Sequence, residues 1–129
     1  MKTFTAIVGR ILFATPMLVF GLMHFMNASM MVGMVPIPGG EFWIYFTGTA
    51  LIAAALSIYI QKFTKLACLL LSLMLMIFVF TIHLPGVMSG DSTTMQMSMS
   101  ALLKDSALSG AALILASVYS NDTIKINQK

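Results

Sequence analysis

The uncharged segment of residues 66–90 is the feature that most constrains how this chain can fold. Its first part, residues 66–86 (LACLLLSLMLMIFVFTIHLPG), is apolar almost throughout and has one histidine, His83, near its end. The hydrocarbon core of a bilayer is crossed by about 20 helical residues. The segment therefore predicts a transmembrane helix, and the chain is expected to be an integral membrane protein.

Three further apolar segments accompany this one in a chain that is 59% hydrophobic and 9% charged. Backbone groups in lipid must pair within the segment, which favours helices for apolar runs of this length. The sequence predicts an all-α, four-transmembrane-helix bundle formed by a single domain, residues 1–129. The first segment is expected to be a retained helix rather than a cleaved signal, because Arg10 interrupts it. The expected helices cover residues 5–26, 41–60, 66–85 and 99–119, with an outer loop at 27–40.

The lysines predict the orientation of the four helices. One set of helix ends is flanked by lysines, whereas the other set has mainly acidic residues and one lysine–aspartate pair. The positive-inside rule places both termini in the cytoplasm and explains the net charge of +3 without a nucleic-acid partner. The lysines on the cytoplasmic side are Lys2, Lys62, Lys65, Lys125 and Lys129.

This topology brings titratable groups from all four helices to one outer level, where they are expected to form a polar pocket. Helix ends are also where polar residues are least costly in a membrane protein, so unrelated interfacial roles remain an open alternative. The candidate ligand-binding residues are His24, Glu41, Tyr45, His83, Lys104 and Asp105. Lys104 and Asp105 are expected about one turn inside the membrane surface.

Arg10 is the charged residue of the first helix, on the face that also has Ala14, Met17, Gly21 and His24. That small and polar face is expected to point toward the other helices, because Gly and Ala allow close approach. Arg10 is then either a charge in the bundle interior or a side chain that extends to the cytoplasmic surface.

Methionine indicates a second chemistry for the same outer side. Met95, Met97 and Met99, together with His24 and His83, offer the thioether and imidazole ligands that bind Cu(I). The alternative is that methionine acts as a flexible apolar filler, in keeping with its 13 copies along the chain. A b-type haem between the two histidines is a weaker interpretation.

Three short motifs carry a resemblance to a known family. They are Gly9-Arg10 with residues 20–25 (FGLMHF), residues 35–40 (VPIPGG) and residues 82–86 (IHLPG). In these three motifs, which are spread over nearly its whole length, the chain resembles the DoxX-like family of small four-helix bacterial membrane proteins. The resemblance implies a helical bundle in the bacterial inner (cytoplasmic) membrane. It also implies a link to quinone-linked sulfur oxidation or to complexes that handle oxidative stress, but no catalytic residue.

The expected function is that of a membrane redox accessory protein whose outer pocket binds a quinone head group or another small polar ligand. The chain has no flavin fingerprint or haem-attachment motif, so catalysis would need a bound cofactor or a partner. Whether it is a subunit of a quinone-linked oxidoreductase stays open. The alternative is a non-enzymatic structural or Cu(I)-handling subunit. Expected partners are the lipid bilayer and a membrane or periplasmic redox protein, and a homo-oligomer stays open.

Overall fold

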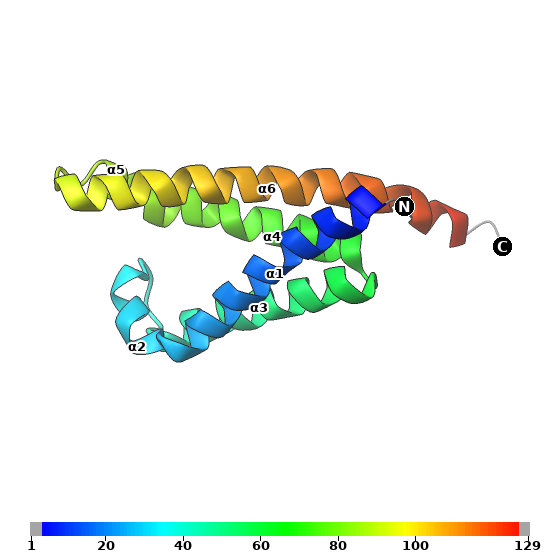
Figure 1. Ribbon diagram of the computed structural model, residues 1–129. Coiled ribbons are helices and arrows are strands. Elements are labelled where there is room, and N and C mark those ends of the chain that lie inside the picture. The colour runs from blue at the N-terminus through cyan, green and yellow to red at the C-terminus, as the bar shows by residue number, and fades with distance from the viewer. Residues whose placement is uncertain (1–3, 127–129) are drawn as a thin grey trace. The chain divides into compact units, whose positions relative to one another are not determined.

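The computed structural model describes residues 4–126, with side chains up to residue 119, and this part of the chain contains helices and no strand (Figure 1). Four helical stretches are long and apolar enough to cross a membrane, which confirms the predicted fold class at that level. The elements are α1 (Phe4–Met26), α2 (Ala28–Met31), η1 (Val32–Met34), α3 (Glu41–Ile60), α4 (Thr64–Phe78), η2 (Val79–His83), α5 (Leu84–Val87) and α6 (Ser92–Ile126).

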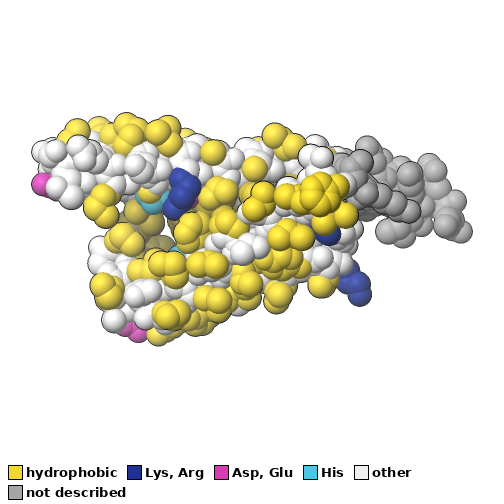
Figure 2. Space-filling model, in the orientation of Figure 1, with side chains coloured by type: hydrophobic (Ala, Val, Ile, Leu, Met, Phe, Trp, Pro, Cys, Tyr) yellow, Lys and Arg dark blue, Asp and Glu magenta, His cyan; other side chains and the backbone are white. Residues whose placement is uncertain are grey.

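Two compact units divide the chain at the start of α4, after Cys68. The first contains α1 to α3, and the second contains the rest of α4, η2, α5 and α6. Hydrophobic side chains cover much of the surface, and charged ones are few (Figure 2). A surface of this kind is suited to lipid rather than water.

In the first unit α1 packs directly against α3, and two glycines lie where the helices meet. A carbon added to Gly48 would lie 2.9 Å from Cβ of His24 and 3.0 Å from the carbonyl oxygen of Gly21. A carbon added to Gly21 would lie 2.9 Å from the carbonyl oxygen of Gly48. Only glycine leaves room for this contact between backbones, which is a common basis of helix association in lipid. The face predicted to point toward other helices is buried at Ala14, Met17 and Gly21.

The expected outer loop, residues 27–40, contains the short helices α2 and η1. Local helical hydrogen bonds satisfy part of the backbone of this apolar segment. Gly39 and Gly40 follow with φ of +130° and +57°, and the indole of Trp43 lies against Gly39. Trp43 Nε1 donates to the carbonyl oxygen of Pro38 at 2.8 Å. These contacts fix the entry into α3.

The turn between α3 and α4 is tight and is held by Ser57. The carbonyl oxygen of Ser57 accepts from the backbone of Lys62 at 3.2 Å and from Oγ1 of Thr64 at 3.3 Å. Gln61 and Phe63 adopt φ of +58° and +57°, a conformation that is uncommon outside glycine. The segment between the expected helices 41–60 and 66–85 is therefore a short turn, and it contains Lys62.

In the second unit α4, η2 and α5 follow one another without a break, so helical structure continues past Leu84-Pro85-Gly86 to Val87. Proline has no N–H to donate to the preceding turn of a helix. The turn before it, η2, is a π-helix in which the N–H of Leu84 donates to the carbonyl oxygen of Val79. Gly86 then packs on α6, because a carbon added there would lie 2.8 Å from Cβ of Ser98.

The last helix, α6, begins at Ser92 rather than near residue 99. Asp91 caps its first turn, since Oδ2 accepts from the backbone N–H of Thr94 at 2.9 Å and from Thr94 Oγ1 at 2.7 Å. Carboxylates favour this position because they satisfy free N–H groups at a helix start. Part of the segment between the expected helices 66–85 and 99–119 is therefore the first turns of α6.

A titration is expected at Asp91. The hydrogen bonds from Thr94, side chain first and backbone second, hold the pKa of the Asp91 carboxyl below its ordinary 3.8. The cap thus stabilises the first turn of α6 above pH 3.8 and is lost as the pH falls through the lower pKa of the folded state. The NMR signal of the Thr94 amide should titrate below pH 3.8. Asp91→Asn keeps a cap but should abolish the titration, and a midpoint at or above 3.8 would contradict this account.

Candidate functional site

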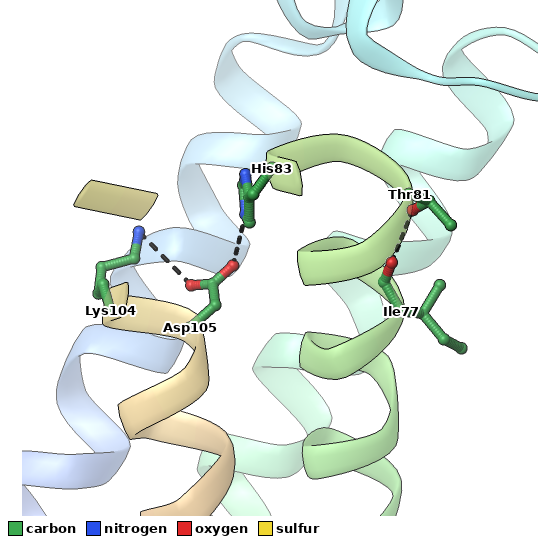
Figure 3. A network of polar contacts seen from close by, with 5 residues as sticks. All are labelled: Ile77, Thr81, His83, Lys104 and Asp105. Atoms are coloured by element: carbon green, nitrogen blue, oxygen red, sulfur yellow. Dashed lines mark hydrogen bonds and ion pairs between the residues drawn. The ribbon is translucent and has the colours of Figure 1, made fainter. Parts of the chain in front are cut away.

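The second unit brings together three of the six predicted site residues, His83, Lys104 and Asp105 (Figure 3). Nε2 of His83 lies 2.7 Å from Oδ2 of Asp105, and Nζ of Lys104 lies 3.7 Å from Oδ1. The Asp105 side chain is 8% exposed, that of His83 18% and that of Lys104 49%. The carboxylate is therefore the buried centre of the group, with a donor on each oxygen.

Two local features of the chain bring these groups together. His83 is the last residue of η2, one turn before the end of the α4–α5 helical stretch. Asp105 lies well inside α6, roughly 20 Å along the axis from Ser92 at 1.5 Å per residue. Because α6 begins at Ser92, Asp105 lies in the helix interior, while the position of the ion pair about one turn inside the membrane surface stays a prediction.

The electrostatics follow from the donor and acceptor inventory. An ionised carboxylate only accepts hydrogen bonds, so Asp105 accepts one from His83 on Oδ2, while Oδ1 forms an ion pair with the ammonium of Lys104. Short bonds to a charged acceptor are among the stronger ones in proteins. Removing the charge of Asp105 from water is unfavourable, and the interactions with His83 and Lys104 offset part of that cost.

A second polar pair continues the site along the contact between α4 and α6. Oγ of Ser72 lies 2.6 Å from Oγ of Ser109, and the Ser109 hydroxyl also donates to the carbonyl oxygen of Ser72 at 3.2 Å. Both serines are buried. The spacing of Asp105, Ser109, Ala112 and Ala116 in the sequence places them on one side of a helix, and all four are buried.

The other three predicted residues belong to the first unit, at the end where α1 stops and α3 starts. Nδ1 of His24 donates to the carbonyl oxygen of Phe20 at 2.7 Å. The ring of Tyr45 packs on Phe25, with centroids 5.4 Å apart. Glu41 is exposed in the first turn of α3, where the helix dipole favours a carboxylate. Their convergence with the group of the second unit, and a haem between the two histidines, stay predictions.

Arg10 is partly exposed and reaches the turn at the end of α3. Its guanidinium donates to the side-chain oxygen of Gln61 when that amide is oriented to accept. Gln61 precedes Lys62, one of the lysines assigned to the cytoplasmic side. The geometry favours an arginine that extends toward this helix end over a charge held in the interior. Of the other lysines in the topology argument, Lys2 and Lys129 lie outside the described residues, and so does the side chain of Lys125.

The three alternating methionines do not lie on one side of α6. Two residues along an α-helix correspond to a rotation of about 200°, so Met97 lies opposite Met95 and Met99. The exposed fractions agree, with 70% for Met97 against 39% and 43% for the other two. The helix thus separates Met97 from the other thioether ligands proposed for Cu(I) and favours the filler interpretation.

Sequence analysis did not predict the hydrogen bonds of the two serines beside the site or the direct bond between His83 and Asp105. A signal for the serines was present, because Ser109 follows Asp105 by one turn and Ser72 lies on the face of α4 that leads to Val79. The bond itself could not be found from either helix alone. Comparison of the chain with known protein families, with curated proteins and with solved structures finds no match.

Proposed function

We propose that this chain is a DoxX-like accessory protein of a membrane redox system. In this proposal His83, Lys104 and Asp105 bind the head group of a quinone or of another small polar ligand. The observation that carries the proposal is the 2.7 Å contact between His83 and a buried Asp105 within helices suited to lipid. Ionisable groups inside transmembrane segments are costly and commonly mark functional sites.

The site suits a ligand that is apolar at one end and polar at the other. The helices around it are apolar enough to lie in a bilayer, from which a quinone tail could enter. The head group would meet an imidazole, which can accept or donate a proton, and an ammonium that is 49% exposed. Reduction or oxidation of a quinone moves protons as well as electrons, so an imidazole–carboxylate pair serves either direction. The electrons would come from or go to a partner protein.

The membrane arrangement belongs to the same proposal. The four helices cross the bacterial inner membrane as a bundle with both termini in the cytoplasm. Lys62 lies in the exposed turn after α3 and Lys65 in the first turn of α4, whereas Glu41 begins α3 and Asp91 precedes α6. This division of charge supports the orientation through the positive-inside rule.

The test is the content of the protein purified from native membranes in mild detergent. We expect extractable quinone in wild-type protein and its loss in His83→Ala and Asp105→Ala. Thr81→Val is the matched control, because Thr81 lies in the same π-helical turn but its hydroxyl donates to the carbonyl oxygen of Ile77 (Figure 3). Stoichiometric copper without quinone would contradict the proposal and support the Cu(I)-handling alternative.

A further inference from the structure

We infer that the site selects the hydroxyl form of its ligand, a hydroquinone or other phenol, whose O–H donates to Nδ1 of His83. This inference rests on the proposed function, since it specifies which state of a quinone-like ligand the same site prefers. It follows from the hydrogen bonds of Asp105, which determine where the proton of the imidazole lies.

The carboxylate of Asp105 determines that the ring hydrogen of His83 lies on Nε2. Asp105 is paired with the ammonium of Lys104 through Oδ1, and the carboxylate of an ion pair is ionised. An ionised carboxylate cannot donate, so at 2.7 Å from Oδ2 the Nε2 atom of His83 must carry the hydrogen. With Lys104 positive and Asp105 negative, the three groups sum to zero charge when His83 is neutral. A membrane interior favours that sum.

A neutral imidazole with its hydrogen on Nε2 has a lone pair on Nδ1. Within the described residues 69–126, Nδ1 of His83 makes no hydrogen bond. The atom therefore offers a ligand an acceptor and no donor. A phenolic hydroxyl complements it, whereas a quinone carbonyl places a second acceptor opposite the lone pair and leaves both without a partner.

Lys104 does not reverse this preference. Its ammonium has only donors, and both a hydroxyl oxygen and a carbonyl oxygen accept from it. Lys104 therefore serves the two forms of the ligand alike, and His83 discriminates between them. One buried hydrogen bond that only the hydroxyl form can make corresponds to about tenfold in affinity.

Asp105→Asn supplies the decisive variant. An amide presents one acceptor and one donor group, and the ammonium of Lys104 attracts the amide oxygen. The amide nitrogen then faces Nε2 and donates to it, which moves the hydrogen of His83 to Nδ1. The variant should donate to a ligand where the wild type accepts. Hydroxyl and carbonyl oxygens both accept from an N–H, so the preference for the hydroxyl form should be lost.

The experiment measures dissociation constants by equilibrium dialysis, with full-length protein in detergent under argon. The ligands are duroquinone, durohydroquinone and the dimethyl ether of durohydroquinone. The ring of duroquinone is fully methylated, so it does not add to the thiol of Cys68. Wild-type protein should bind durohydroquinone about tenfold more tightly than either of the others. Asp105→Asn should bind duroquinone and durohydroquinone about equally, and Thr81→Val should keep the wild-type order.

The outcomes separate the inference from the function on which it rests. Binding of duroquinone as tight as, or tighter than, that of durohydroquinone to the wild type would overturn the inference and leave the quinone site standing. An unchanged order in Asp105→Asn would also overturn it, because the tautomer would then not determine the preference. Absence of binding for all three compounds would overturn both.

Discussion

Gly48→Ala is expected to lower the free energy of unfolding of the first unit by about 2 kcal/mol, and Gly48→Leu is expected to lower it by more. The added carbon would lie within 3.0 Å of Cβ of His24, the carbonyl oxygen of Gly21 and a ring carbon of Phe25. Two of these atoms cannot rotate away, because one is backbone and the other is the first carbon of a side chain. The helices α1 and α3 must therefore separate to accept the methyl group.

The measurement is the unfolding free energy in mixed micelles as the fraction of denaturing detergent rises, followed by circular dichroism. Gly9→Ala is the matched control, because a carbon added to Gly9 of α1 has nothing within 4 Å. The control should be as stable as the wild type or slightly more so, since alanine favours helix over glycine. A Gly48→Ala variant with the unfolding curve of the control would show that the contact between α1 and α3 is not close.

The second large effect is expected between His83 and Asp105. A double-mutant cycle with alanine at each position should give a coupling of about 1.5 kcal/mol, because the bond is short, partly buried and made to a charged acceptor. The same unfolding assay measures it. In hydrocarbon-like surroundings the separated partners also find other donors, which keeps the coupling from being larger.

The pair Lys104 and Asp105 is the internal comparison for this cycle. Its atoms are 3.7 Å apart and the lysine side chain is about half exposed, so its coupling should stay below about 1 kcal/mol. Equal coupling energies in the two cycles would mean that the bond from His83 is no stronger than the half-exposed ion pair of Lys104. A coupling near zero between His83 and Asp105 would contradict the geometry of the site.

Apolar length and helical spacing were enough to predict the main elements of the fold. Runs such as residues 41–60 are long enough for a bilayer and contain no internal charge, so a helix is the only regular structure that pairs their backbone in lipid. Spacing also predicted the buried face of Asp105 and Ser109, because positions four apart lie on one side of a helix.

Helix ends and deviations from regular geometry could not be predicted in the same way. Residues 92–94 are Ser-Thr-Thr, which suit a loop as well as a helix start, and the capping bond to Asp91 decides between them. Pro85 indicated a stop, but a helix can continue through a proline when the preceding turn widens. Hydropathy carries no information on either choice.

The candidate site was predictable as a set of residues and not as a set of bonds. The sequence placed His83 and Asp105 near one level because neighbouring helices in a membrane alternate in direction. Which oxygen meets which nitrogen depends on side-chain rotamers and on the register between α4 and α6, which no single helix determines. The alternating methionines were instead predicted to act together when they do not. Residues two apart lie on one face of a strand, but on a helix they lie on opposite faces.

The widened turn at Val79–His83 also bears on how related chains would differ in length. A π-helical bond joins residues five apart instead of four, so this turn holds one residue more than a regular α-helix would. A relative that lacked one residue between positions 79 and 83 could form an uninterrupted α-helix and still present the face after Leu84 to α6. Sequence alignments of such relatives should therefore show a one-residue gap here, inside a long apolar helix.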